Sequence, residues 1–222
     1  HASPQCSSTS AQGSRGRARP ADGRAGVAVL SGGAPLVRAN KIHAGFDSGV
    51  LVSEKGRGTI EGNDIFDNRR AGVAILREGA PVVRKNRIYN GCDSGVLVCE
   101  NGRGSVVDNV IYANRMAGVA IGRGGASSIT GNTIRDGRGG SLCLSQYSRG
   151  IISANLIMQD PSTLMQVPDD LFSTVVQQNQ VQCVTGGAAE DGAASQLCDR
   201  DAGVAAADDA RPMDWDEIHY CG

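Results

Sequence analysis

The chain has 222 residues, enough for one domain of ordinary size. Its formal net charge of −1 gives no reason to expect nucleic acid or an acidic membrane surface as a partner. No apolar stretch approaches the roughly 18 residues of a membrane span, so we expect neither a membrane segment nor a secretion signal in this sequence. Because the first residue is His and not Met, we expect a processed or partial chain.

The cysteines are scattered and include no CxxC pair. They stand at Cys6, Cys92, Cys99, Cys143, Cys183, Cys198 and Cys221. With only three histidines in the chain, this spacing predicts no zinc site, no other metal and no cofactor. An odd, scattered set is also a poor disulfide framework, so we expect reduced thiols in an intracellular protein, in the cytoplasm or nucleus.

The N-terminal segment, residues 1–23, consists mostly of Ser, Arg, Gly, Pro and Ala. It has almost nothing to bury, and we expect a disordered lead.

Residues 24–184 form a repeat. The 46-residue block 25–70 is written again, with more than half of its residues unchanged, at 71–116, and a finer period of 23 runs through both copies. Asparagines mark it at Asn40, Asn63, Asn86, Asn109, Asn132 and Asn155, and Asn179 follows after 24 residues. Isoleucines follow two residues later at Ile42, Ile65, Ile88, Ile111, Ile134 and Ile157.

A period in the low twenties with no room for a helix in any repeat predicts three short strands per coil. The fold class is therefore all-β, a right-handed single-stranded parallel β-helix of six to seven coils, the hand following from the crossover preference of parallel strands. Leucine-rich repeats are the alternative, but the Leu content is low. We expect the Asn and Ile columns to be inward structural ladders, and the column from Gly33 to Gly125 to form bends with positive φ.

Charged residues alternate in sign from coil to coil. The four columns are Arg24, Asp47, Arg70 and Asp93; Lys41, Asp64 and Arg87; Arg38, Glu61 and Arg84; and Glu54, Arg77, Glu100 and Arg123. Alternation gives each charge opposite neighbours about 4.8 Å away. It therefore accounts for the charges structurally, and we find no unpaired carboxylate cluster or other constellation that predicts catalysis.

Aromatic residues share one outward column, made of His43, Phe66, Tyr89 and Tyr112 and flanked by Lys41 and Arg87. Outward aromatics beside charge are typical of a contact patch for protein or sugar. These six residues are the candidate partner-binding site, although self-stacking that rigidifies the sheet explains the column equally well.

A second outward column is apolar, namely Ala28, Leu51, Ala74, Leu97 and Ala120, with Leu30 and Leu76 beside it. We expect something to cover it: the C-terminal segment around Trp215, a neighbouring domain or a partner.

The repeat loosens toward its end. A Pro-broken loop at 160–170 precedes LFSTVVQQNQV, which we expect to supply a last strand of a C-terminal cap. Residues 185–222 read as a mostly disordered tail, with 213–220 as a short docking segment if it is ordered.

The run PVVRKNRIYNGCDSGVLVCENGRGSVVDNVIYANRMAGVAI resembles the β-helix repeats of the F-box only proteins, within the carbohydrate-binding and sugar-hydrolysis domain group. The likeness covers about residues 25–181. It implies an intracellular substrate-recognition module related to cullin-RING (SCF-type) ubiquitin ligases. An adaptor is a partner only if an F-box lies outside this chain, and the zinc-finger spacing that can follow such repeats is absent from it.

The prediction is therefore a non-enzymatic β-helix that binds a protein client. A carbohydrate-active or carbohydrate-binding β-helix, of the lyase, hydrolase or epimerase kind, is the alternative, and a purely structural repeat is a third possibility. Saturable binding of a uronate polymer that is lost in Tyr89→Ala would favour the second.

Overall fold

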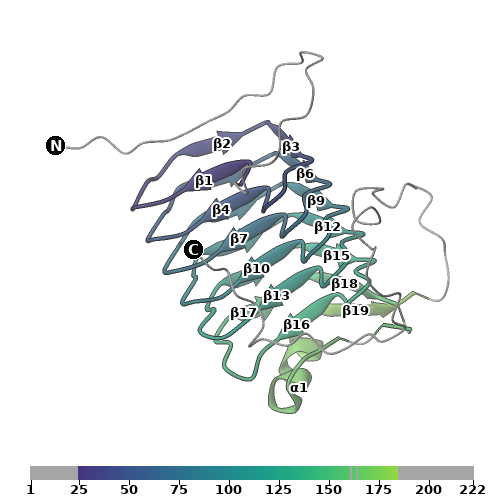
Figure 1. Cartoon of the computed structure of the whole chain (residues 1–222). Helices are drawn as coiled ribbons and strands as arrows, with labels where there is room; N and C mark the ends of the chain where they lie inside the picture. Colours follow the sequence, from purple (N-terminus) through teal and green to yellow (C-terminus); the bar gives the residue numbers. More distant parts are fainter. Residues whose placement is uncertain (1–24, 161, 164, 185–222) are drawn as a thin grey trace, which may run out of the picture.

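The computed structural model describes residues 25–160, 162–163 and 165–184. In this range the chain winds through a stack of coils, and each coil before the last contributes one strand to each of three parallel sheets (Figure 1). The expected lead at 1–23 and tail at 185–222 lie outside the described residues.

The first sheet, sheet A, holds β1 (Val27–Val29), β4 (Val50–Val52), β7 (Val73–Ile75), β10 (Val96–Val98), β13 (Val119–Ile121) and β16 (Leu142–Leu144). Sheet B holds β2 (Leu36–Arg38), β5 (Thr59–Glu61), β8 (Val82–Arg84), β11 (Ser105–Val107), β14 (Ser128–Thr130) and β17 (Ile151–Ser153). Sheet C holds β3 (Lys41–His43), β6 (Asp64–Phe66), β9 (Arg87–Tyr89), β12 (Val110–Tyr112), β15 (Thr133–Arg135), β18 (Leu156–Gln159) and β19 (Gln180–Cys183).

The register confirms the predicted period. Ile65 pairs with Ile88, and up to β18 every strand pairs with the residues 23 positions away. Strands of three residues place one side chain inward in sheets B and C and two inward in sheet A, so each coil adds one layer of Val and Ile to a continuous core. The isoleucines of β6, β9, β12, β15 and β18 are fully buried, which confirms the Ile ladder.

The asparagine ladder is also confirmed. In each interior step the Oδ1 of one Asn accepts hydrogen bonds from the backbone N and the Nδ2 of the Asn one coil before, as Asn86 does from Asn63 at 2.9 Å each. The Nδ2 of Asn86 also donates to the Ile60 carbonyl. These buried amides are thereby satisfied, and they bind each coil to its neighbours.

The predicted reason for the glycine column is wrong. At Gly56, Gly79 and Gly102 φ is not positive; the left-handed residues are the two before each glycine, such as Arg77 and Glu78. Glycine is needed because the preceding coil's backbone approaches closely: a Cβ on Gly79 would lie 2.5 Å from the Val52 carbonyl oxygen.

The last strand predicted within residues 171–181 is confirmed only at its end, where β19 pairs with β18; the residues before it form a helix instead. Helix α1 (Asp169–Gln178) stands where a sheet B strand of the final coil would lie and packs against β17 and β19 at the end of the stack (Figure 1). An extended segment there would leave an unpaired edge, whereas a helix satisfies its own backbone. Buried Val175 closes the core, and Asn179 both ends the ladder and caps the helix through Val175 O.

Candidate functional site

The aromatic column on sheet C is a continuous stack. His43, Phe66, Tyr89 and Tyr112 come from β3, β6, β9 and β12, with ring centroids 4.7, 5.1 and 4.8 Å apart and interplanar angles of 14°, 9° and 7°. The spacing is that of adjacent parallel strands, so the fold imposes the stack once an aromatic occupies this position in successive coils. We call these four residues the aromatic ladder.

Charged side chains complete the ladder. Arg87 pairs with Asp64 at 3.5 Å, donates to the Tyr112 hydroxyl at 3.0 Å and lies 5.3 Å from the Tyr89 centroid. The hydrogen bond to Tyr112 is the main cause that raises the pKa of Arg87 above its ordinary value. The structure therefore brings Arg87 into the predicted site, held in place by three partners.

Lys41 is exposed at the first coil and is in register with Asp64 in the next strand. Of the six predicted site residues, Lys41 and His43 are thus at the N-terminal end of the site, and Tyr112 is the most buried.

The sequence reasoning missed a further member of this column. The Arg135 guanidinium lies 4.6 Å from the Tyr112 centroid and also contacts the Asp136 carboxylate. Arg135 is 23 residues beyond Tyr112, so the period itself was the signal. A cation over the last ring ends the ladder with a charge.

The faces of the interior rings are occupied by their neighbours, and Arg135 lies over Tyr112. What the ladder presents outward is a row of ring edges and polar atoms. Burial is the main cause that raises the pKa of the Tyr89 hydroxyl, which therefore stays protonated at neutral pH.

Asp67 lies beside this surface, at the turn after β6. Burial raises the pKa of its carboxyl above the ordinary value, and the nearby His43 opposes that shift. Its Oδ1 is buried without a hydrogen-bond partner. Sequence reasoning did not single out Asp67, because its burial depends on the path of the turn.

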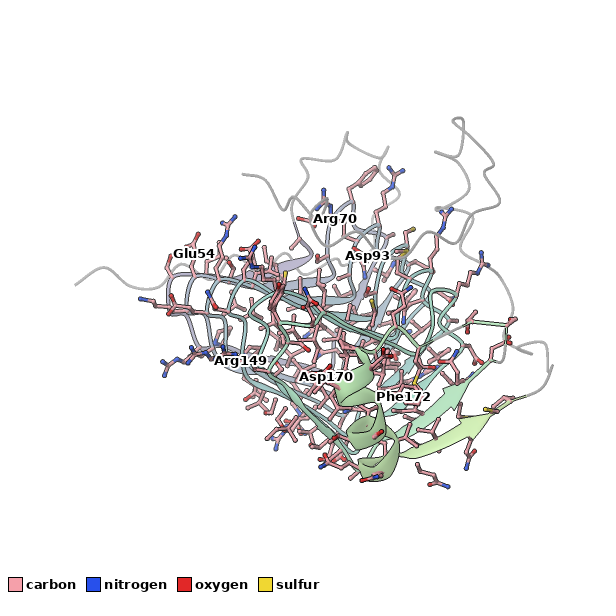
Figure 2. All side chains as sticks on the ribbon, turned by 90° about the horizontal axis from the view of Figure 1, so that it is seen from below. Glu54, Arg70, Asp93, Arg149, Asp170 and Phe172 are labelled. Carbon is pink, nitrogen blue, oxygen red and sulfur yellow. The ribbon has the colours of Figure 1, made fainter. Side chains whose placement is uncertain are left out.

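The charge columns are paired as predicted. Four arginine–carboxylate pairs form between neighbouring coils: Arg70–Asp47 at 3.8 Å, Arg77–Glu100 at 3.1 Å, Arg84–Glu61 at 3.1 Å and Arg87–Asp64 at 3.5 Å. Arg24 lies outside the described residues. Seen along the stack in Figure 2, Arg70 and Asp93 lie at one corner of the coil, away from the corner with Glu54 and Arg149. The carboxylates are thus distributed over separate faces and mostly committed to arginines.

Within the described ranges, no group of three or more His, Cys, Asp or Glu side chains is arranged to hold a metal ion. No helix of that same part is long and apolar enough to cross a membrane. Thiols are free at Cys99, Cys143 and Cys183 as predicted, and burial raises the pKa of Cys99 to about 12 and of Cys143 to about 11. The prediction of reduced thiols is wrong at Cys92, which is disulfide-bonded.

Stacked single coils of parallel strands around one core define the class of this protein: it is a parallel β-helix solenoid. The chain belongs to the right-handed β-helix family, whose model, described as a right-handed beta helix region, matches residues 9–157 and 89–192. The predicted hand is confirmed by this match. No curated protein and no solved structure matches the chain significantly.

Proposed function

We propose that this β-helix is a non-enzymatic module that binds a protein client through the aromatic ladder and its flanking Lys41, Arg87 and Arg135. The observation that carries the proposal is the edge-on ladder. Ring edges carry partial positive charge and, with the guanidinium groups, suit carbonyl, carboxylate and aromatic groups of a polypeptide.

The same geometry weighs against a sugar partner at this surface. A pyranose packs against the face of an aromatic ring, and the faces within the ladder are already covered at about 5 Å. The two end faces of the ladder differ: Arg135 lies over the outer face of Tyr112, whereas the outer face of His43 has no ring of the ladder over it, because β3 is the first strand of sheet C.

We further propose a cellular role for this binding. The resemblance of the repeats to those of the F-box only proteins supports a role as an intracellular substrate receptor of a cullin-RING ubiquitin ligase. An F-box outside this chain would supply the link to the ligase adaptor, and the β-helix would select the protein to be ubiquitinated.

The test is quantitative affinity capture from an extract of the source cells with three immobilised chains: the wild type, Tyr89→Ala and Val82→Ala. Val82 is exposed on the outer side of sheet B and serves as the matched control. We expect a client that is retained by Val82→Ala and lost by Tyr89→Ala, and whose purified form binds the wild-type chain at least about tenfold more tightly than Tyr89→Ala, roughly 1.4 kcal/mol. Identical captured sets for all three chains would refute the proposal.

A carbohydrate-active function is the second candidate, and one observation favours it: Asp67, with its raised carboxyl pKa and unpartnered Oδ1 near His43, has the properties of a general acid. Glycoside hydrolysis also uses a second carboxylate. The Asp64 carboxylate is ion-paired with Arg87, which weighs against this candidate. Incubating the chain and its Asp67→Asn variant with uronate and neutral oligosaccharides tests it. Turnover by the wild type alone would support this candidate, and no turnover by either chain would remove it.

A further inference from the structure

The outer side of sheet A is apolar and buried. Sheet A turns one side chain per strand away from the core, and these form a second apolar cluster with residues at the strand ends. Its buried members are Ala71, Ala74, Leu76, Leu97, Cys99, Ala117, Ala120 and Cys143. We call this cluster the outer apolar face; Leu97 and Cys143 are each only 1% exposed.

No described helix or strand accounts for this burial. The described elements pack on one another through the three sheets, and α1 contacts mainly β17 and β19 at the end of the stack. Figure 1 shows α1 below β16, away from the strands β7, β10 and β13 that carry most of the outer apolar face. A leucine on the outer side of a sheet loses nearly all its solvent contact only when another segment lies over it.

A disulfide ties another segment to the edge of this face. Cys92 is disulfide-bonded, while the other described cysteines, Cys99, Cys143 and Cys183, are free. Its partner within the chain is therefore one of the three cysteines outside the described residues. These are Cys6, Cys198 and Cys221.

Cys92 stands in a basic column. Its backbone and those of Arg115 and Arg138 each donate to the preceding coil, which stacks Arg69, Cys92, Arg115 and Arg138 at intervals of 23 residues. Arg69 and Arg115 are two residues before Ala71 and Ala117, so this column borders the outer apolar face.

Charge and apolar content select the C-terminal segment as the occupant. Residues 185–222 contain nine Asp or Glu and two Arg, a net charge of −7 by subtraction, whereas residues 25–184 contain sixteen Lys or Arg and thirteen Asp or Glu, a net charge of +3. Residues 1–24 have no large apolar side chain. The sequence MDWDEIHYCG at 213–222 combines four large apolar residues, three acidic ones and Cys221 within ten positions.

We propose that residues 213–222 lie across the outer apolar face of the same chain. Trp215 and its apolar neighbours cover Leu97 and Ala120, the acidic residues face the basic column, and Cys221 is the disulfide partner of Cys92. This surface is on sheet A, so the proposal does not depend on the aromatic ladder of sheet C.

The disulfide forms by exchange with a small disulfide such as oxidised glutathione. One protein thiolate attacks its S–S bond and releases one glutathione thiolate; the second protein thiolate then attacks the mixed disulfide and releases the other. Both released thiolates take up the protons lost by Cys92 and Cys221, and the small disulfide is the two-electron oxidant. In a reducing compartment the apolar and ionic contacts alone hold the segment.

Peptide mapping of the full chain tests the linkage. After alkylation of free thiols and non-reducing trypsin digestion, Cys92 lies in residues 88–103 and Cys221 in residues 201–222, because the Arg211–Pro212 bond resists cleavage. We expect these two peptides to be joined and to separate on reduction, with fragment ions placing the link at Cys92 and an alkyl group at Cys99. A link from Cys92 to residues 1–15 or 150–200, a free Cys92 thiol or a disulfide-linked dimer would overturn the assignment.

Fluorescence tests the docking itself, because Trp215 is the single tryptophan. We expect acrylamide to quench Trp215 weakly in the wild type and several-fold more strongly in Leu97→Gln, whose substitution is in the outer apolar face. Leu36→Gln is the matched control, since Leu36 is 62% exposed on sheet B. Strong quenching already in the wild type, or equal quenching in all three chains with unchanged circular dichroism, would refute the docking.

A thiol assay in the full chain with Cys92→Ser separates the disulfide from the contacts. Cys99 and Cys143 belong to the outer apolar face, whereas Cys183 is an exposed reference thiol. If the contacts hold the segment without the disulfide, Cys99 and Cys143 stay alkylated at least about tenfold more slowly than Cys183 in this variant. Equal rates for all three thiols in the wild-type chain would contradict the coverage of this face.

Discussion

The asparagine ladder makes the sharpest stability prediction, at Asn86. Its Oδ1 accepts from the backbone N and Nδ2 of Asn63, and its Nδ2 donates to the Ile60 carbonyl and to Asn109 Oδ1, all at 2.9 Å. The Asn86→Ala substitution removes these four hydrogen bonds from a site that is closed to water.

One of the groups left behind decides the magnitude. The Asn63 backbone N–H loses the acceptor that the ladder gives it, whereas Asn63 Nδ2 still donates to Val37 O, Asn109 Oδ1 still accepts from the backbone N of residue 86, and the Ile60 carbonyl stays within the pairing of β5 with β8. A buried polar group without a partner costs about 1 to 3 kcal/mol. We therefore expect Asn86→Ala to lower the free energy of unfolding by about 1 to 3 kcal/mol, a substantial part of the total for a domain.

Urea unfolding followed by far-ultraviolet circular dichroism measures this loss, with Asn40→Ala as the matched control. Asn40 is the exposed first member of the ladder and donates only to Arg38 O and Asn63 Oδ1 through its side chain. We expect the control to lose less than about 1 kcal/mol, because water replaces exposed hydrogen bonds. Equal losses for the two variants would show that the ladder's internal hydrogen bonds do not hold the coils together.

Three further substitutions test other parts of the reasoning. Gly79→Ala should lower the free energy of unfolding by about 1 to 3 kcal/mol, because the new Cβ would meet the Val52 carbonyl oxygen at 2.5 Å; an unchanged urea midpoint would contradict this close approach. The raised pKa of Asp67 means that folding disfavours its carboxylate, so this group lowers the free energy of unfolding as pH rises from the ordinary pKa of 3.8 through the higher folded pKa. Asp67→Asn should flatten the fall of the melting temperature between acid and neutral pH. Parallel pH profiles of the melting temperature for the wild type and the variant would refute the shift. Arg77→Glu should remove the 3.1 Å pair with Glu100 and bring like charges into one column. We expect it to lower the melting temperature more in low salt than in about 1 M salt, where the Debye length of about 3 Å screens the repulsion. A salt-independent loss would assign the effect to packing instead.

The aromatic ladder and the outer apolar face differ in what they leave exposed. The aromatic ladder on sheet C presents ring edges and guanidinium groups to a partner, whereas the outer apolar face on sheet A is already buried. A client that binds sheet C leaves sheet A covered by the chain's own C-terminal segment, so Leu97→Gln should weaken docking of that segment without changing client affinity.

The period of 23 residues determined most of the fold by itself. Because a parallel strand places each residue beside its counterpart one coil away, the spacing of Asn63, Ile65 and Phe66 sufficed to predict an amide ladder, an apolar column and a ring stack. The alternating charges and the aromatic part of the candidate site followed from the same 23-residue spacing. Arg135 would have followed if the aromatic column had been extended one coil beyond Tyr112.

Only the tertiary structure decided what happens at the end of the repeat and between segments that do not share its period. Helix α1 replaces a strand because the last coil has no neighbour to receive its backbone hydrogen bonds. The raised pKa of the Asp67 carboxyl, the close approach at Gly79 and the burial of Leu97 likewise depend on which atoms of another segment come near. A repeat in sequence states which residues lie above one another, but burial and electrostatic shifts depend on three-dimensional distances between segments that share no period.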